Sequence, residues 1–434
     1  MTEREIKSRM LDQAAAALGR TALRIRSPLY RNALVLIVNA GVTAGLGFVF
    51  WALAARLYSP TQVGLASAAI SGALFVGALS QLGLQYTVVR FGAGTDREPG
   101  LVTSIVLVVL AAATLGGVAF VGGLELWSPR LLAMTDRAVL AVILVPLAAG
   151  AAGGGILTWV AVAARDTRPA FVAGATQGVV KALLVVGLAL LGFRVEIGIV
   201  LAWAVATGAA VGLEAWLLRR QFTRPVRIQL PRLRTYLRYS AGNYAAELAW
   251  VAPSLLYPLL VVGVLGAEEN AYFYVAWAMA GLLAAVPVAI ASSLLAEGSH
   301  ATDELTDHLR KAAELTLALL LPAIIGYWVL GSSLLRLFGG PYAEHGGDVL
   351  RILAVAMVPL SVCYLHLTVA RIRQQIRRVL VISLGVGAGS LVLSLILAGP
   401  LGVAGIALGY LAALLLVASL LTVRSVVLMR RARA

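Results

Sequence analysis

Long, uninterrupted apolar runs constrain this chain more than any other feature. Twelve stretches of about 20 residues or more are nearly free of charge, and this length carries an α-helix across the hydrocarbon core of a bilayer. Transmembrane strands show alternation over only about ten residues, so these runs do not fit a β-barrel. The sequence therefore predicts an all-α polytopic membrane protein. The approximate spans are 32–57, 63–89, 101–123, 138–163, 171–191, 195–218, 239–263, 270–295, 313–338, 349–370, 378–398 and 401–425.

The composition agrees with this class. The 434 residues are 60% hydrophobic and 13% charged, with a mean hydropathy of +0.91, whereas soluble domains are about 45–50% apolar and about 25% charged. Cys363 is the single cysteine, so no intramolecular disulfide forms, and the four histidines lack metal-ligand spacing. We expect no metal and no organic cofactor. Residues 1–30 are predicted to form an amphipathic segment at the membrane surface, because Ile6, Met10 and Ala14 recur every four residues.

The net charge of +15 is distributed unevenly. Only six basic residues lie on the side opposite the termini, and Lys181 lies inside a helix, which leaves 28 of the 35 Lys and Arg on the side of the termini. This asymmetry is the positive-inside rule, which places both termini in the cytoplasm of a multi-pass plasma membrane protein. It also explains the charge without a nucleic-acid partner. The six residues are Arg56, Arg130, Arg137, Arg194, Arg336 and Arg351.

The two halves of the chain resemble each other at an offset of 207 residues. "GFRVEIGIVLA" from Gly192 aligns with "GPLGVAGIALG" from Gly399, and Arg31 aligns with Arg238. Each half has six helices, so both keep the same orientation and a pseudo-twofold axis runs along the membrane normal. We expect five segments, namely an N-terminal amphipathic segment (1–30), an N-terminal lobe (31–218), an Arg-rich linker (219–236), a C-terminal lobe (237–425) and a basic tail (426–434).

Lys181 is the most informative single residue, because it lies near the midpoint of its helix, about 15 Å from either end. A lysine facing lipid at this depth costs about 2.5–3.5 kcal/mol, so we expect it to face the protein interior together with Gln177, one turn earlier. Three interpretations stay open, namely a ligand group in a wet cavity, an ion pair with a carboxylate, and a deprotonated amine that only packs.

The helix at 239–263 carries a polar stripe that includes Asn243, Tyr244 and Glu247. Polar groups are costly in hydrocarbon, so the stripe is predicted to line solvent between the lobes. Asn39 belongs to a thinner stripe on the equivalent helix of the first half. Glu247 has two interpretations, either a coupling group for protons or sodium or the ion-pair partner of Lys181.

Three arginines, Arg31, Arg90 and Arg238, lie at the predicted cytoplasmic ends of helices. Each one alone is explained as a membrane anchor of the positive-inside type. As a group they are also candidates for lining the cytoplasmic mouth of a central cavity.

The sequence resembles the polysaccharide flippases of the multidrug/oligosaccharidyl-lipid/polysaccharide exporter superfamily. The resemblance is carried by "FWALAARLYSPTQVGLASAAIS" at Phe50, "LGAEENAYFYVAWAMA" at Leu265 and "LRLFGGPYAEHGGDVLRILAVAMVPL" at Leu335, and it covers about residues 30–425. It implies two six-helix lobes around a cationic central cavity that opens alternately to the two sides. It also implies a lipid-linked oligosaccharide as cargo, whose phosphate Lys181 would hold. The cargo would move from the cytoplasmic to the external leaflet for surface polysaccharide or lipopolysaccharide biosynthesis. We expect the protein to act as a monomer.

Two other functions remain as alternatives. A multidrug exporter of the same fold would favour carboxylates in its cavity, and Glu247 is the one candidate on the polar stripe. A membrane glycan polymerase or ligase would need a long external loop with catalytic Arg or His, but the external loops at about 124–137 and 339–348 are short. We therefore expect a transporter and not an enzyme.

Overall fold

The computed structural model of the chain describes residues 28–91, 100–222, 230–298 and 305–433. Within these ranges the chain is helical and contains no strand. The first half consists of α2 (Pro28–Leu57), α3 (Pro60–Ser80), α4 (Leu84–Phe91), α5 (Leu101–Gly122), α6 (Leu124–Trp127), η1 (Pro129–Ala133), α7 (Arg137–Ala163), α8 (Arg168–Leu190), α9 (Glu196–Leu217) and η2 (Arg219–Gln221). The second half consists of α10 (Leu230–Val264), α11 (Ala267–Gly298), α12 (Leu305–Leu335), α13 (Gly340–Ile372) and α14 (Ile376–Arg433). The predicted amphipathic segment up to residue 27 lies outside the described residues.

The predicted twelve crossings are confirmed in this part of the chain. Ten helices are long and apolar enough to cross a membrane, and the shorter apolar stretch Gly41–Leu57 of α2 adds another. The apolar part of α14 counts twice, because a left-handed residue at Gly402 (φ 58°) separates two helices there. The Ser394 hydroxyl donates to the Ile406 carbonyl at 2.8 Å, so the two helices turn back on each other.

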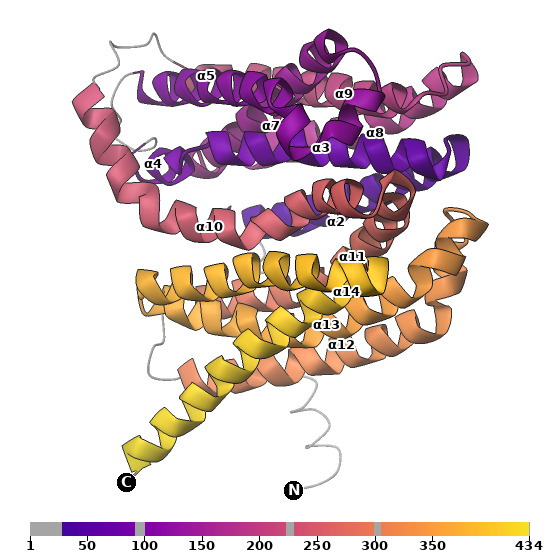
Figure 1. The fold of residues 1–434 in the computed structure, drawn as a ribbon. Helices are drawn as coiled ribbons and strands as arrows, with labels where there is room; N and C mark the ends of the chain where they lie inside the picture. The colour runs from indigo at the N-terminus through magenta and orange to yellow at the C-terminus, as the bar shows by residue number, and fades with distance from the viewer. Residues whose placement is uncertain (1–27, 92–99, 223–229, 299–304, 434) are drawn as a thin grey trace, which may run out of the picture.

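The helices form two lobes. Figure 1 shows α2 to α9, in indigo to magenta, stacked above the later helices in orange and yellow, with α10 along the boundary. Most helices run in the same direction across the picture, as the crossings of a bilayer do. The end of α4, the start of α10 and the turn between α13 and α14 lie at one end of the lobes, which we call the inner end because it is the predicted cytoplasmic one. The opposite end is called the outer end.

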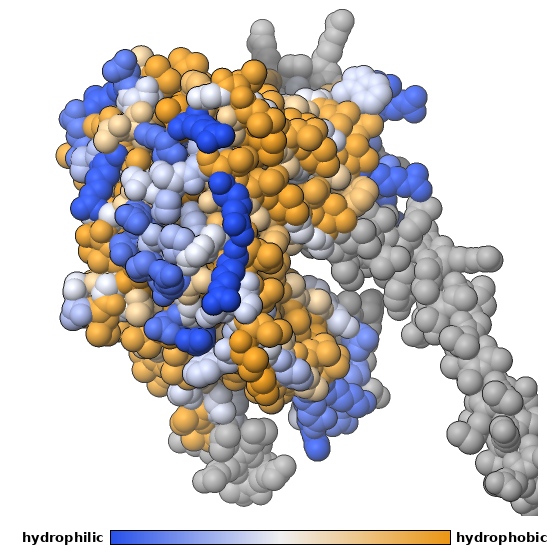
Figure 2. Space-filling view, turned by 90° about the vertical axis from the view of Figure 1, so that its right-hand side faces the viewer, coloured by the Kyte–Doolittle hydropathy of each residue, from blue (hydrophilic) through white to orange (hydrophobic). Residues whose placement is uncertain are grey.

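At the outer end, α3 begins with a helix-capping motif, and the surface there carries many hydrophilic residues. The stretch Ser59 to Gln62 forms a capping box, in which the Ser59 side chain accepts from the Gln62 backbone and the Gln62 side chain accepts from the Ser59 backbone. Pro60 occupies the first turn, where no N–H is needed. Figure 2 looks onto this end and shows hydrophilic residues gathered over its middle and its left side, next to a broad apolar surface.

The second crossing differs from the prediction of one continuous helix over 63–89. It breaks after Ser80, and α4 starts at Leu84, because Leu82 (φ 53°) and Gly83 (φ 75°) adopt left-handed conformations. A Cβ on Gly83 would lie 2.8 Å from the Cβ of Tyr244 and 2.9 Å from that of Ser240. Glycine therefore allows both the backbone turn and the close approach of α10 from the other lobe.

Candidate functional site

Lys181 lies in the middle of α8 and is buried, with 4% of its surface exposed. Its Nζ atom lies 4.0 Å from the centre of the Trp203 ring and 5.3 Å from that of Phe50. Aromatic faces attract a cation at these distances. Among the described residues, no carboxylate lies within ion-pair distance of Lys181. The ammonium group thus faces the protein interior, as expected from its depth, but its neighbours are aromatic rings.

An aromatic cluster around Lys181 reaches from one lobe to the other. Phe50 and Trp51 of α2 contact Trp203 of α9, with ring centres 5.2 and 5.7 Å apart. Trp51 also contacts Tyr274 of α11 at 4.7 Å, and α11 belongs to the second lobe. The Trp203 indole N–H is buried and has no acceptor in the described part of the chain. The Lys181 ammonium and the Trp203 indole N–H thus lie close together, and neither has an acceptor among the described residues.

Gln177 faces α9 from the same side of α8 as Lys181. Its Nε2 donates to the Thr207 hydroxyl at 2.8 Å, and this hydroxyl donates to the Trp203 carbonyl at 2.9 Å. The predicted shared face of Gln177 and Lys181 is therefore observed, and it packs inside the first lobe in this structure.

Glu214 is a buried carboxylate that the sequence analysis did not consider. It lies on α9 with 3% of its surface exposed, and Thr158 of α7 donates to its Oε1 at 3.4 Å. Trp203, Thr207 and Glu214 follow one another at helical spacing, so this polar line was visible in the sequence as an interruption of an apolar helix. Glu214 is a second candidate for a coupling group, on the first lobe.

Glu247 bridges the two lobes at the inner end. Its Oε2 accepts from the Tyr86 hydroxyl at 2.7 Å and from Gln85 Nε2 at 3.0 Å, and both donors lie on α4 of the first lobe. Charge-assisted hydrogen bonds of this kind are about twice as strong as neutral ones. Glu247 is therefore held by uncharged donors here and does not pair with Lys181.

Further contacts complete what we call the inner seam, the set of lobe contacts made by Gln85, Tyr86, Ser240, Tyr244 and Glu247. The Tyr244 hydroxyl donates to the Ala78 carbonyl at 3.2 Å and also to that of Leu79. The hydroxyls of Thr87 and Ser240 lie 3.4 Å apart. The inner end of the lobe boundary is thus closed by side chains of the predicted polar stripe.

The outer seam is built from Arg56, Gly64, Ser67, Arg130 and Asn270. Asn270 is fully buried, and its Nδ2 donates to the Gly64 carbonyl at 2.7 Å and to the Ser67 hydroxyl at 3.0 Å. Arg56 of the first lobe donates to the Leu337 carbonyl at 2.9 Å, and Arg130 donates to the Val262 carbonyl. The two lobes are therefore joined at both ends of their boundary.

The remaining predicted site residues lie toward the inner end. Asn243 is half-buried on α10, and Arg90 is exposed at the end of α4. Arg238 is exposed too, but it lies within α10 and not at its start, because α10 begins at Leu230. Arg31 and Asn39 lie on α2 at positions whose side chains are outside the described part of the structure. The roles of all these residues in binding stay predictions.

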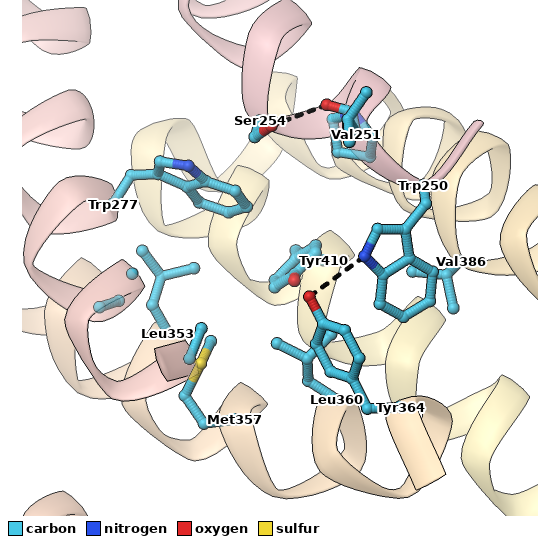
Figure 3. Close-up of a pocket in the computed structure, with 14 residues that line it drawn as sticks. Trp250, Val251, Ser254, Trp277, Leu353, Met357, Leu360, Tyr364, Val386 and Tyr410 are labelled. Carbon is cyan, nitrogen blue, oxygen red and sulfur yellow. Dashed lines mark hydrogen bonds between the residues drawn. The ribbon is translucent and has the colours of Figure 1, made fainter. Parts of the chain in front are cut away.

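A cavity of about 270 Å³ lies inside the second lobe, between α10, α11, α13 and α14. Figure 3 shows Trp277 and Leu353 on one side and Trp250 and Tyr364 on the other. None of the lining residues is charged. We call it the aromatic cavity, and its lining residues are Trp250, Val251, Pro253, Ser254, Trp277, Ala280, Gly281, Ala284, Leu353, Met357, Leu360, Tyr364, Val386 and Tyr410.

The sequence analysis did not find the aromatic cavity. Its aromatic residues come from four helices that are far apart in the chain, and none of them stands out from an apolar background. Two lining residues, Trp250 and Ser254, lie on α10 within two helical turns of Glu247, so the polar stripe points toward one wall of the cavity.

Comparisons with solved structures identify the fold. The lipid II flippase MurJ in an inward closed conformation is similar with a TM-score of 0.71 and 13% identity, over 90% of this chain and 87% of that one. An inward-facing multidrug resistance transporter of the MATE family gives 0.61 and 16%, over 87% and 92%. A transporter of the MOP superfamily from Pyrococcus furiosus, described as having a binding pocket of reverse polarity, gives 0.58 and 15%, over 94% and 96%.

The chain has the fold of the MOP superfamily. This agrees with the resemblance noted in the sequence and with the two-lobe, twelve-helix architecture. No family model matches the sequence, and no curated protein matches it. The fold is thus established by structure, whereas the function has to be inferred from the residues of this chain.

Proposed function

We propose that this protein is a flippase that moves a polyprenyl-linked oligosaccharide from the cytoplasmic to the external leaflet by alternating access between its lobes. The observation that carries this proposal is the buried Lys181, which has no carboxylate partner among the described residues. An intramembrane charge of this kind marks a functional site by default. The phosphate of a lipid-linked glycan supplies the missing anion. Similarity to a lipid II flippase supports the same substrate class.

In this proposal the sugar head enters between the lobes while the lipid tail stays in the bilayer. Lys181 binds the phosphate, and Gln177, Asn39, Asn243 and Tyr244 contact sugar hydroxyls. Tyr244 becomes available when the inner seam opens, because its hydroxyl then leaves the carbonyls of α3. Arg31, Arg90 and Arg238 line the inner mouth and attract the anionic head.

Glu247 is proposed as the ion-coupling residue. It loses the two hydrogen bonds from α4 when the inner seam opens, and a proton or a sodium ion then compensates its charge. The chain contributes binding groups and lobe movement, and no bond of the cargo is broken. One copy of the chain contains all the groups that this cycle needs.

The test of the proposed function is a flipping assay in vesicles that contain the purified protein and a fluorescent polyprenyl-pyrophosphoryl glycan. We expect Lys181→Ala to slow flipping by about 10-fold or more, because a charge-assisted contact to phosphate contributes about 1.5–3 kcal/mol. Lys311→Ala is the matched control, since Lys311 is an exposed lysine on α12. If Lys181→Ala flips the cargo as fast as the parent, Lys181 does not hold the phosphate.

A multidrug exporter is the second candidate, and the aromatic cavity is the observation that favours it. Aromatic rings attract lipophilic cations even where no carboxylate is present, and solved multidrug transporters share this fold. Overexpression in a drug-sensitive host would then raise resistance to lipophilic cations. Under the flippase proposal we expect no such change.

A further inference from the structure

We propose that the aromatic cavity of the second lobe is a binding site for one uncharged sugar ring. The inference rests on the proposed function, because it assigns the phosphate and a sugar of the same cargo to different lobes. Lys181 lies on α8 of the first lobe, whereas every residue that lines the cavity belongs to α10, α11, α13 or α14. The cargo head would therefore span both lobes.

The absence of charge in the lining excludes the ionic part of the cargo from the cavity. None of its lining residues is acidic or basic, so a phosphate or carboxylate there would lose its hydration without gaining a partner. The occupant has to be uncharged.

The size of the cavity and its aromatic walls fit a single ring. Its volume of about 270 Å³ is just under the range of about 300–1,000 Å³ for sites of drug-sized ligands. Trp250 and Tyr364 form one aromatic pair with ring centres 4.8 Å apart, and Trp277 and Tyr410 form another at 5.0 Å. The negative face of an aromatic ring attracts positively polarised C–H groups, which both faces of a pyranose ring present.

Hydrogen-bonding groups in the cavity distinguish a sugar from a hydrocarbon. The Tyr364 hydroxyl accepts from Trp250 Nε1 at 3.2 Å and keeps its own proton to donate. The Tyr410 hydroxyl makes no hydrogen bond to a described residue, and Figure 3 shows both hydroxyls in the space between the two tryptophans. An isoprenoid chain or a quaternary cation offers these donors no acceptor. Sugar hydroxyls both donate and accept, so they satisfy them.

The experiment titrates the purified protein in nanodiscs, free of sugar-based detergent, with methyl glycosides of neutral hexoses, deoxyhexoses and N-acetylhexosamines. Intrinsic tryptophan fluorescence reports binding, because Trp250 and Trp277 line the cavity. We expect saturable quenching by at least one glycoside, with a Kd on the order of millimolar. Tyr410→Phe should weaken binding about 2- to 10-fold, since it removes one hydrogen bond. Tyr327→Phe is the matched control, because Tyr327 lies in the same lobe outside the cavity.

Two results would overturn this inference. The first is that no glycoside of the panel binds. The second is that farnesol or tetraphenylphosphonium binds in place of the glycosides, which would make the occupant a lipid chain or a lipophilic cation. Lys181→Ala is expected to bind glycoside as the parent does. Flipping without glycoside binding rejects only this inference, and glycoside binding without flipping rejects only the proposed function.

Discussion

At the scale of single residues, the aromatic contacts of Lys181 explain how an apolar helix accommodates a charged side chain. Trp203 and Phe50 take the place of water around the ammonium group, at 4.0 and 5.3 Å from their ring centres. A desolvated cation over an aromatic face gains about 2 kcal/mol or more. This gain offsets part of the cost of burying the charge, and it leaves the N–H groups available to an anion.

Trp203→Ala should lower the free energy of unfolding, because it removes both a half-buried ring and the attraction on Lys181. We expect a loss near the lower end of the about 3–5 kcal/mol typical of Trp→Ala in cores. Thermal unfolding in detergent measures it as a lower Tm. Trp216→Ala serves as the control, since Trp216 is 58% exposed on the same helix, and its Tm should stay near that of the parent. Equal Tm changes in both variants would contradict the stabilising role of Trp203.

At the scale of helices, the break between α3 and α4 positions the inner seam. Gly83 at φ 75° turns the chain so that Gln85 and Tyr86 point their side chains at Glu247 of α10. A continuous helix over these residues would keep its backbone straight and would not give α10 the close approach at Ser240 and Tyr244. The inner seam thus depends on the helix break at residues 81–83.

Gly83→Ala is expected to destabilise the protein by about 1–2 kcal/mol, the cost of a left-handed conformation with a Cβ, with further loss from the contact with Tyr244. Chemical or thermal unfolding gives the value. Gly187→Ala is the matched control, because Gly187 lies within α8 with open space around it, and there alanine should stabilise by about 0.5–1 kcal/mol. We expect the free energy of unfolding to fall in Gly83→Ala and to rise in Gly187→Ala. An unchanged free energy of unfolding in Gly83→Ala would contradict the close approach of α10 to Gly83.

At the scale of the whole molecule, the two ends of the lobe boundary use different chemistry. The outer seam consists of amides, hydroxyls, backbone carbonyls and arginines, none of which titrates near neutral pH. The inner seam contains the carboxylate of Glu247, which accepts from the phenol of Tyr86, and the phenol of Tyr244 lies one helical turn away on α10. Neutralising Glu247 is therefore expected to weaken the inner seam and to leave the outer seam unchanged.

Glu247→Gln is expected to shift the protein toward an inward-open form, because an amide oxygen accepts hydrogen bonds more weakly than a carboxylate. Spin labels at Arg219→Cys and Arg373→Cys, both exposed at the inner end, should move apart. A second pair at Leu191→Cys and Glu344→Cys reports the outer end and should not move apart. If the inner distance distribution stays that of the parent, the carboxylate does not hold the seam.

The sequence predicted the fold well, because each crossing is encoded locally as a run of apolar residues. The depth of Lys181 also predicted its burial. Its contacts with Trp203 and the contacts of Glu247 with α4 were not predictable, because they depend on which helices become neighbours. The break at Leu82 was missed for a further reason, since a leucine at positive φ is not favoured by its own conformational preference. In the structure, α10 packs directly against this break at Ser240 and Tyr244, a contact that the sequence does not reveal.

The aromatic cluster that joins Trp51 to Tyr274 has a consequence for the electrical tightness of the membrane. A fixed positive charge halfway through a bilayer would act as an intermediate binding site for permeating chloride if water reached it. In this structure the rings of Trp203 and Phe50 lie over the Lys181 ammonium, and 4% of the residue is exposed, so little of that charge is open to water or to a permeating anion.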